Sequence, residues 1–306
     1  MRKLALFAAL LLLPIMAGCS VEVTVDNPRP EVYAFISSET STGQVGEIIS
    51  GLEKAADDFR LSIETIQMDL SNHPDDAFKK INKAIRKSTK ALIVSSFEND
   101  ELAKYLEKAH KKGIPIIYMD PVKKFDISGT YITYNKKEAA VKAGQLLAEA
   151  MEKEGEAVLL NTSWDDPKAA DLENGFKEAL QQYPAIKLIN LYYCNGQRDN
   201  TRKTLQDILA AHPNIKGILA ACPETAAAAA EYVNNERKGE IQIVAFDYTD
   251  EIVQLINHGQ LCGTVGLNYS DLGYEAVRTA ADVISGHNVD SDIVLDFETL
   301  VRKDPA

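Results

Sequence analysis

The histidines are the first residues to consider for catalysis or metal binding. They are His73, His110, His212, His258 and His287. None of them forms the pair, four residues apart with an acidic neighbour, that a zinc-binding helix requires. The sequence also has no Gly-x-Ser-x-Gly nucleophile elbow and no phosphate loop ending in Gly-Lys-Ser/Thr. We therefore expect no enzyme, no metal site and no cofactor.

The cysteines divide into Cys19 near the N-terminus and three in the body, Cys194, Cys222 and Cys262. The body therefore holds an odd number, and it has no Cys-x-x-Cys pair. A Cys194–Cys222 disulfide is conceivable because both residues follow expected strands. Buried or free thiols are the commoner arrangement for such cysteines.

The first residues have the pattern of an export signal. Arg2 and Lys3 precede an uncharged, mostly apolar run that reaches Gly18. This run is shorter than the roughly 20 apolar residues that span a bilayer. We therefore expect residues 1–18 to be a signal peptide and the protein to be exported.

The end of that run, Ala17-Gly18-Cys19, resembles the lipobox of bacterial lipoproteins. The resemblance implies that Cys19 is lipidated and anchors the protein to the membrane. Met16 stands where Leu is usual, and an ordinary signal peptide with an incidental cysteine is the alternative. Residues 19–30 are expected to form a polar tether, because Pro28 and Pro30 cannot join a β-ladder.

Composition limits the class of protein. The 306 residues include 33 Lys and Arg against 45 Asp and Glu, which gives a formal net charge of −12. Nucleic-acid binding needs clustered basic residues, so this balance argues against it. Hydrophobic residues make up 45 % of the chain and charged residues 25 %, as in ordinary globular proteins, and the length suggests about two domains.

From Glu31 onward, short β-branched or aromatic runs alternate with longer amphipathic stretches. The expected strands are 32–37, 62–70, 91–96, 115–120, 129–133, 157–162, 187–193, 217–221, 242–247 and 261–267. The expected helices are 44–60, 75–88, 100–112, 136–153, 167–182, 199–211, 224–236, 249–258 and 270–285. This alternation predicts βαβ units and parallel sheets, in which ligands bind beyond the carboxyl ends of the strands.

Several short stretches stand at the boundaries of these elements. They are 91–96 (ALIVSS), 113–120 (GIPIIYMD), 173–176 (ENGF), 212–218 (HPNIKGI), 244–247 (VAFD) and 259–265 (GQLCGTV), followed by Gly273. In this order and spacing they resemble the periplasmic sugar-binding proteins of the ribose-binding type. Those proteins are the binding subunits of ABC importers and share their fold with the ligand-sensing half of LacI-type repressors. The resemblance covers about residues 31–303.

The resemblance implies an α/β fold of the type I periplasmic binding proteins, with two Rossmann-like lobes of parallel sheet joined by a three-strand hinge. The expected N-terminal lobe is 31–134 plus 268–296. The expected C-terminal lobe is 135–267 plus 297–306. It also implies a monomer whose lobes close on a small molecule.

Three polar positions of the family match this chain. They are Asp120 after the fourth strand, Asp247 in the Phe-Asp stretch, and Arg198 at the start of a helix. Carboxylates accept hydrogen bonds from pairs of sugar hydroxyls, and Arg supplies donors in a fixed fork. The resemblance therefore implies a sugar or related polyol as ligand. The alternative for Asp120 and Asp247 is a helix cap or an ion pair with a surface lysine, and the alternative for Arg198 is a rim charge.

The chain departs from the family at other ligand positions. Pro121 and Leu172 replace two arginines, Cys222-Pro223 replaces an Asn-Asp pair, and Leu267 replaces a glutamine. The aromatic pair of the first strand loop is absent, since residues 38–44 read SETSTGQ.

Other aromatic residues are placed to compensate for that missing pair. Trp164, Phe97, Tyr134 and Tyr248 each stand at or near the end of an expected strand. We expect these four residues and Cys222 to line the ligand site, and packing against loop bases is the alternative.

Two functions follow from these observations. The first is a lipid-anchored receptor that delivers a small polar ligand to an ABC permease. The alternative is a sensor that presents its ligand, including autoinducer-2-like molecules, to a membrane histidine kinase or chemoreceptor. The departures from the family pattern keep this alternative open. A repressor is not expected, because the chain begins with an export signal.

Overall fold

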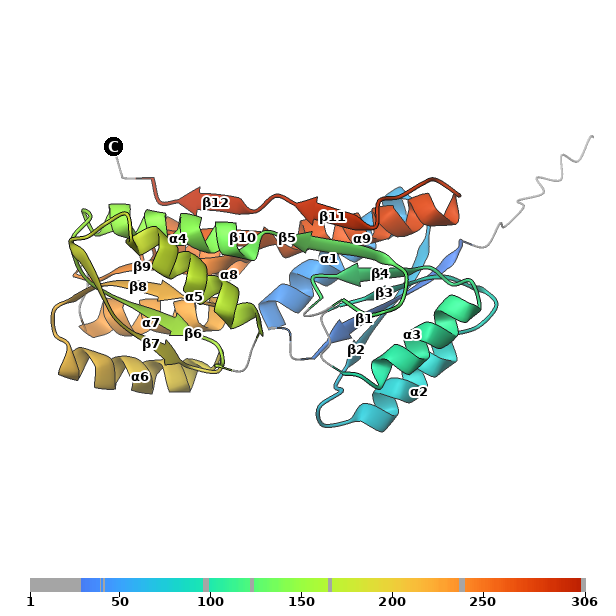
Figure 1. Cartoon of the computed structure of the whole chain (residues 1–306), viewed down its shortest axis with the longest axis horizontal. Coiled ribbons are helices and arrows are strands. Elements are labelled where there is room, and N and C mark those ends of the chain that lie inside the picture. The colour runs from blue at the N-terminus through green and yellow to red at the C-terminus, as the bar shows by residue number, and fades with distance from the viewer. Residues whose placement is uncertain are drawn as a thin grey trace, which may run out of the picture.

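The computed structural model describes residues 29–38, 40, 42–95, 99–121, 124–164, 167–236 and 240–303. The expected signal peptide, Cys19, most of the tether and Phe97 lie outside the described residues. Figure 1 shows two α/β halves side by side, each built around one sheet.

The first sheet has six parallel strands in the order β11-β5-β4-β3-β1-β2. Its strands are β1 (Glu31–Ser37), β2 (Ser62–Met68), β3 (Thr89–Val94), β4 (Ile116–Met119), β5 (Thr130–Tyr134) and β11 (Asp292–Leu295). The central strands are buried on both faces, as expected for a parallel sheet covered by helices.

The second sheet repeats this order as β12-β10-β9-β8-β6-β7. Its strands are β6 (Gly155–Asn161), β7 (Ile186–Tyr193), β8 (Ile215–Ala220), β9 (Gln242–Tyr248), β10 (Gly263–Asn268) and β12 (Glu298–Val301). Only the pairing of β12 with β10 is antiparallel among its described pairs. Matching the two orders makes β4 the counterpart of β9, and β5 the counterpart of β10.

Nine helices connect the strands in the described part of the chain. They are α1 (Thr42–Asp58), α2 (Pro74–Ala84), α3 (Leu102–Lys111), α4 (Lys136–Ala150), α5 (Pro167–Leu180), α6 (Arg198–Ala211), α7 (Pro223–Glu236), α8 (Asp250–Asn257) and α9 (Tyr269–Ile284). Every helix and strand expected from the sequence overlaps one of these elements, which confirms the expected alternation of strand and helix in two α/β halves. The expected helix 75–88 ends earlier, at Ala84, because the chain turns there and β3 already begins at Thr89.

The chain passes between the two halves three times: after β5, after β10, and between β11 and β12 (Figure 1). Helix α4 leaves the first sheet and packs on α5 of the second half, while α9 leaves the second sheet and packs on α1 of the first. Glycine permits close contact in the α4–α5 pair. A Cβ at Gly175 would lie only 2.5 Å from the Lys137 carbonyl oxygen.

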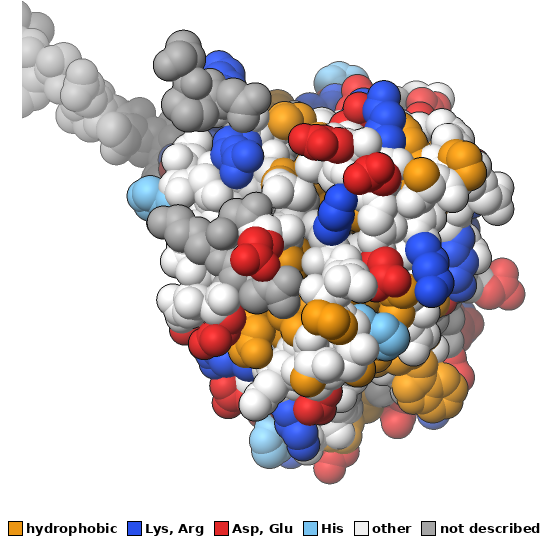
Figure 2. All heavy atoms as spheres, turned by 90° about the vertical axis from the view of Figure 1, so that its left-hand side faces the viewer, with side chains coloured by type: hydrophobic (Ala, Val, Ile, Leu, Met, Phe, Trp, Pro, Cys, Tyr) orange, Lys and Arg blue, Asp and Glu red, His pale blue; other side chains and the backbone are white. Residues whose placement is uncertain are grey.

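Charged side chains of both signs are interspersed over the end of the molecule that the second sheet forms (Figure 2). In the described part of the chain, no helix is both long enough and apolar enough to cross a bilayer. The same residues contain no group of three or more His, Cys, Asp or Glu side chains placed to hold a metal ion.

Candidate functional site

Asp120 directly follows β4 and is the first anchor of the candidate site. Its residue is only 5 % exposed, and its backbone has a φ of 41°, in the left-handed region that Asp tolerates better than most residues. Its backbone N–H donates to the Ile132 carbonyl at 2.8 Å, which ties the end of β4 to β5. The Lys136 ammonium donates to Oδ1 of its carboxylate.

Asp247 occupies the matching position in β9 and is the second anchor. It is 7 % exposed, and its φ of 78° is again left-handed. Its Oδ2 accepts hydrogen bonds from Gln44 Nε2 at 2.8 Å and from the Tyr269 hydroxyl at 3.1 Å. Its Oδ1 accepts from the Tyr134 hydroxyl at 3.4 Å. Asp247 therefore joins α1, the end of β5 and the start of α9.

The backbone beside Asp247 explains why a glycine faces it. A Cβ at Gly266 in β10 would lie 2.5 Å from the Asp247 backbone nitrogen and 3.0 Å from its Oδ1. Only a residue without a side chain leaves room for this strand end. Gly266 therefore allows β10 to approach the backbone and carboxylate of Asp247 this closely.

The charges of Asp120 and Asp247 both act on the same two tyrosine hydroxyls, those of Tyr134 and Tyr269. Burial raises the pKa of the Tyr134 and Tyr269 hydroxyls well above the ordinary value, and the charges of Asp247 and Asp120 raise both further. Both hydroxyls therefore stay protonated and act as hydrogen-bond donors to Asp247. Among the described residues, Asp120 and Asp247 are the only buried charged ones.

We define the central cluster as Gln44, Asp120, Tyr134, Lys136, Asp247 and Tyr269. Three of its members, Asp120, Tyr134 and Asp247, were expected from the sequence. Gln44, Lys136 and Tyr269 were not expected as site residues. Lys136 carried one usable signal, because a lysine at the first position of a helix opposes the helix dipole and so needs a specific partner.

Cys222 lies beside this cluster, at the start of α7. Its Sγ is 3.2 Å from Thr225 Oγ1. Burial raises the pKa of the thiol to about 11, and the Asp247 charge contributes to that rise. Cys222 is thus a neutral, partly buried group within electrostatic range of Asp247.

The other expected residues lie in more exposed surroundings. Arg198 donates from Nη2 to both carboxylate oxygens of Glu251, at 2.6 and 2.8 Å, and the side chain is 39 % exposed. Trp164, on the loop after β6, is 79 % exposed. Tyr248 is partly buried next to the acidic groups Glu47, Asp250 and Glu298, which raise its pKa after the larger effect of burial.

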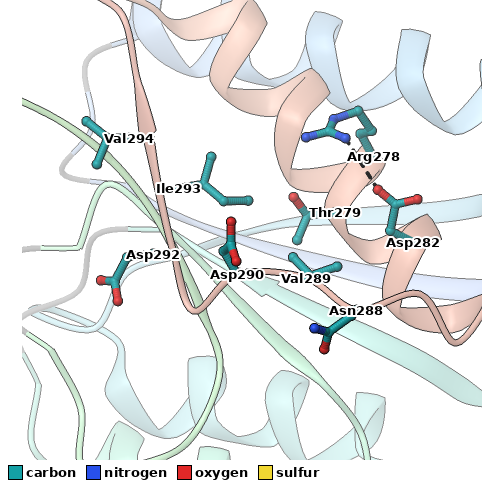
Figure 3. A pocket seen from close by; sticks show the side chains of 9 residues that line it. All are labelled: Arg278, Thr279, Asp282, Asn288, Val289, Asp290, Asp292, Ile293 and Val294. Carbon is teal, nitrogen blue, oxygen red and sulfur yellow. Dashed lines mark hydrogen bonds and ion pairs between the residues drawn. The ribbon is translucent and has the colours of Figure 1, made fainter.

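A hollow of about 380 Å³ lies elsewhere, between the end of α9 and β11 (Figure 3). Arg278 and Asp282 form an ion pair at its wall at 3.4 Å, and Asp290 and Asp292 also line it. None of its lining residues belongs to the central cluster.

Comparison with known proteins identifies the family. The model of the periplasmic binding protein domain matches residues 33–288. The chain belongs to this family. Its sequence is 21 % identical over 284 residues to the ribose import binding protein RbsB of Escherichia coli, covering 93 % of this chain and 95 % of that protein. It is 27 % identical over 187 residues to the D-apiose import binding protein of Actinobacillus succinogenes, covering 60 % of each chain.

Solved structures show the same fold for this periplasmic binding protein. A solute-binding protein of an ABC transporter from Actinobacillus succinogenes, solved with bound D-allose, superposes with a TM-score of 0.82. It is 20 % identical in sequence, and the match covers 90 % of this chain and 98 % of that one. The resemblance to the ribose-binding type that the sequence indicated is therefore confirmed.

Proposed function

We propose that this protein is the substrate-binding component of an ABC importer and captures a sugar or related polyol between its two halves. The observation that carries the proposal is the pair of buried aspartates at matching strand ends in the two sheets. The named ligands and import roles of the relatives support it.

In this proposal the carboxylates of Asp120 and Asp247 accept hydrogen bonds from ligand hydroxyls. A carboxylate has about four acceptor sites, so it can hold donors of the protein and of a ligand together. Lys136, Gln44, Tyr134 and Tyr269 orient these carboxylates. Cys222, Trp164, Tyr248, Arg198 and Phe97 are proposed to line the remainder of the site.

The proposed moving parts are the two lobes, 31–134 with 268–296 and 135–267 with 297–306. The three passages between the halves provide the hinge. A ligand shifts the balance toward closure only if it binds the closed arrangement more tightly than the open one. Contacts from both aspartates supply that difference, since closure brings both sheets to one ligand.

Titration with a panel of pentoses, hexoses and polyols tests the function by thermal shift. A true ligand at 100 times its Kd stabilises the protein by about 2.7 kcal/mol. Asp120→Asn and Asp247→Asn should each weaken binding by about tenfold or more. Asp207→Asn, on the exposed face of α6, is the matched control and should bind normally. A panel in which no compound stabilises the protein contradicts the proposal.

We also propose that the mature protein is exported and anchored to the membrane by lipid on Cys19, with residues 19–30 as the tether. The pattern of residues 1–19 supports this. Cys19→Ser should move the protein from the membrane fraction to the soluble fraction, whereas Cys262→Ser should leave it at the membrane. Unchanged membrane retention of Cys19→Ser contradicts the lipid anchor.

A further inference from the structure

Lys136 has an unusual position for a lysine. It is the first residue of α4, immediately after the N-cap Asn135, and its side chain is only 15 % exposed. Its ammonium donates to Asp120 Oδ1 and lies 4.5 Å from the centre of the Tyr134 ring. The charge is therefore held between a buried carboxylate and an aromatic face.

This placement has a cost that Asp120 must offset. The N-terminus of a helix carries partial positive charge, so a cation in the first turn is unfavourable. Lys137, the next residue, points to the surface instead and meets Glu178 at 2.8 Å with about half of its side chain exposed. The inward position of Lys136 thus depends on its ion pair with Asp120.

The second half of the protein has a different residue in the same place. Tyr269 is the first residue of α9, follows the N-cap Asn268, and donates its hydroxyl to Asp247. Each anchor aspartate is thus contacted by the first residue of the helix that follows the neighbouring strand. One aspartate meets a cation, and the other meets a neutral hydroxyl.

We infer that Lys136 is a specificity-determining residue that neutralises Asp120 and so selects neutral, hydroxylated ligands over ligands with a protonated amine. The inference rests on the proposed function of sugar binding. A ligand ammonium near Asp120 would face the Lys136 ammonium, and like charges repel strongly where water is scarce. A ligand hydroxyl can share the Asp120 carboxylate with Lys136 at no such cost.

The test compares a neutral sugar with its amino counterpart. The probes are the neutral sugar of the panel that stabilises the protein most and the derivative in which an amino group replaces one hydroxyl. Calorimetry at pH 6 and low salt measures both affinities, because the amine is protonated there. Lys136→Met should lower the ratio of neutral to amino affinity by about tenfold, the scale of one charge-assisted hydrogen bond.

Matched variants separate charge from structure. Lys137→Met removes a lysine from the same helical turn and should leave the ratio unchanged. Lys136→Arg keeps the charge and should keep the preference for the neutral sugar. Lys136→Gln replaces Lys136→Met if the latter does not fold. An unchanged ratio in a folded, neutral variant at position 136 overturns the inference while sugar binding stands. Failure of every sugar to bind the unaltered protein overturns the proposed function, and the inference falls with it.

Discussion

Asp120 and Asp247 occupy the same place in two sheets that repeat one strand order. Asp120 follows β4, the third strand counted from the β11 edge of its sheet. Asp247 stands at the carboxyl end of β9, the third strand counted from the β12 edge of the other sheet. Both residues have a left-handed backbone. Such a backbone is uncommon outside glycine and persists where surrounding structure enforces it. Here the surrounding bonds are those that Lys136, Gln44, Tyr134 and Tyr269 make to the two carboxylates.

Removing the Asp247 carboxylate should destabilise the fold as well as weaken ligand binding. Asp247→Ala leaves the buried donors of Gln44, Tyr134 and Tyr269 without this acceptor, at a cost of about 3 kcal/mol in the free energy of unfolding. Urea denaturation followed by circular dichroism measures it. Asp207→Ala on the surface of α6 should change that free energy by less than about 0.5 kcal/mol. Equal effects of the two substitutions would show that the Asp247 network adds no stability.

A methyl group at position 266 should disturb the same carboxylate through the backbone. Gly266→Ala forces β10 and Asp247 apart and should lower the free energy of unfolding by about 2 kcal/mol. Ligand affinity should fall too, because Asp247 Oδ1 lies next to the added methyl. Gly46→Ala in α1 has open space around its Cβ and should stabilise the helix by up to about 1 kcal/mol. Normal stability and ligand affinity in Gly266→Ala would refute the close approach of the two strands.

Glu47 links the halves and should make stability depend on pH. Its Oε1 accepts from the Asp250 backbone N–H at 3.1 Å, at the start of α8. Burial, and after it the Asp250 charge, raises the Glu47 pKa above its ordinary value of 4.5, although that backbone hydrogen bond opposes the rise. A raised pKa means that the folded state holds the proton more tightly than the unfolded state. The stabilisation that protonated Glu47 gives the folded state is complete below the pKa that Glu47 has in the unfolded state. It disappears as the pH rises through the pKa that Glu47 has in the folded state.

Urea denaturation at steps from pH 4 to pH 7 checks this link. Relative to the unaltered protein, Glu47→Gln should become progressively more stable as the pH rises. Glu53→Gln, exposed on the same helix, controls for the loss of one carboxylate. If the free energy of unfolding of Glu47→Gln instead fell relative to that of the unaltered protein as the pH rose, folding would lower the Glu47 pKa and the prediction would be wrong.

The three body cysteines should be unreactive in the folded protein. Burial raises the pKa of Cys194, Cys222 and Cys262, and for Cys222 it reaches about 11. At pH 8 only about one Cys222 thiol in a thousand is then ionised, so alkylation should be slow. In the Cys19→Ser variant, the denatured and unreduced protein should show three thiols, because all three are free in the structure. A count of one would instead reveal a disulfide.

Trp164 offers a direct report on ligand binding. It is the only tryptophan of the chain and is 79 % exposed, so its emission should be that of an indole in water. Closure of the site over a ligand should bury the ring and shift the emission to shorter wavelength. Trp164→Phe removes the signal and, if the ring stacks on the ligand, also weakens binding. A shift absent at saturating ligand would place Trp164 outside the binding site.

The sequence predicted the regular core well, because buried parallel strands and amphipathic helices leave strong periodic patterns. It did not predict β11 and β12 as separate elements. Both have four residues, and their alternating partial exposure resembles that of a loop. Their strand character comes from pairing with β5 and β10, residues far away in the chain.

At the candidate site too, residues placed by a local pattern could be predicted, whereas contacts between distant parts of the chain could not. Asp120 and Asp247 could be predicted because they stand at strand ends that the pattern defines. Gln44 and Tyr269 could not, since their contact with Asp247 depends on chain segments separated by more than 200 and by more than 20 residues. For Arg198, the local pattern gave the helix start but could not reveal its ion pair with Glu251.

The late position of β11 and β12 has a consequence for how the chain acquires its structure. Asp292 pairs with Tyr131, and Val301 pairs with Gly263, so each sheet gains this edge strand only from residues 292–301. A chain synthesised from its N-terminus therefore cannot complete either sheet until this segment has been made. Pairings so distant in sequence form slowly. Completion of the two sheets thus depends on one short late segment that crosses from one half to the other.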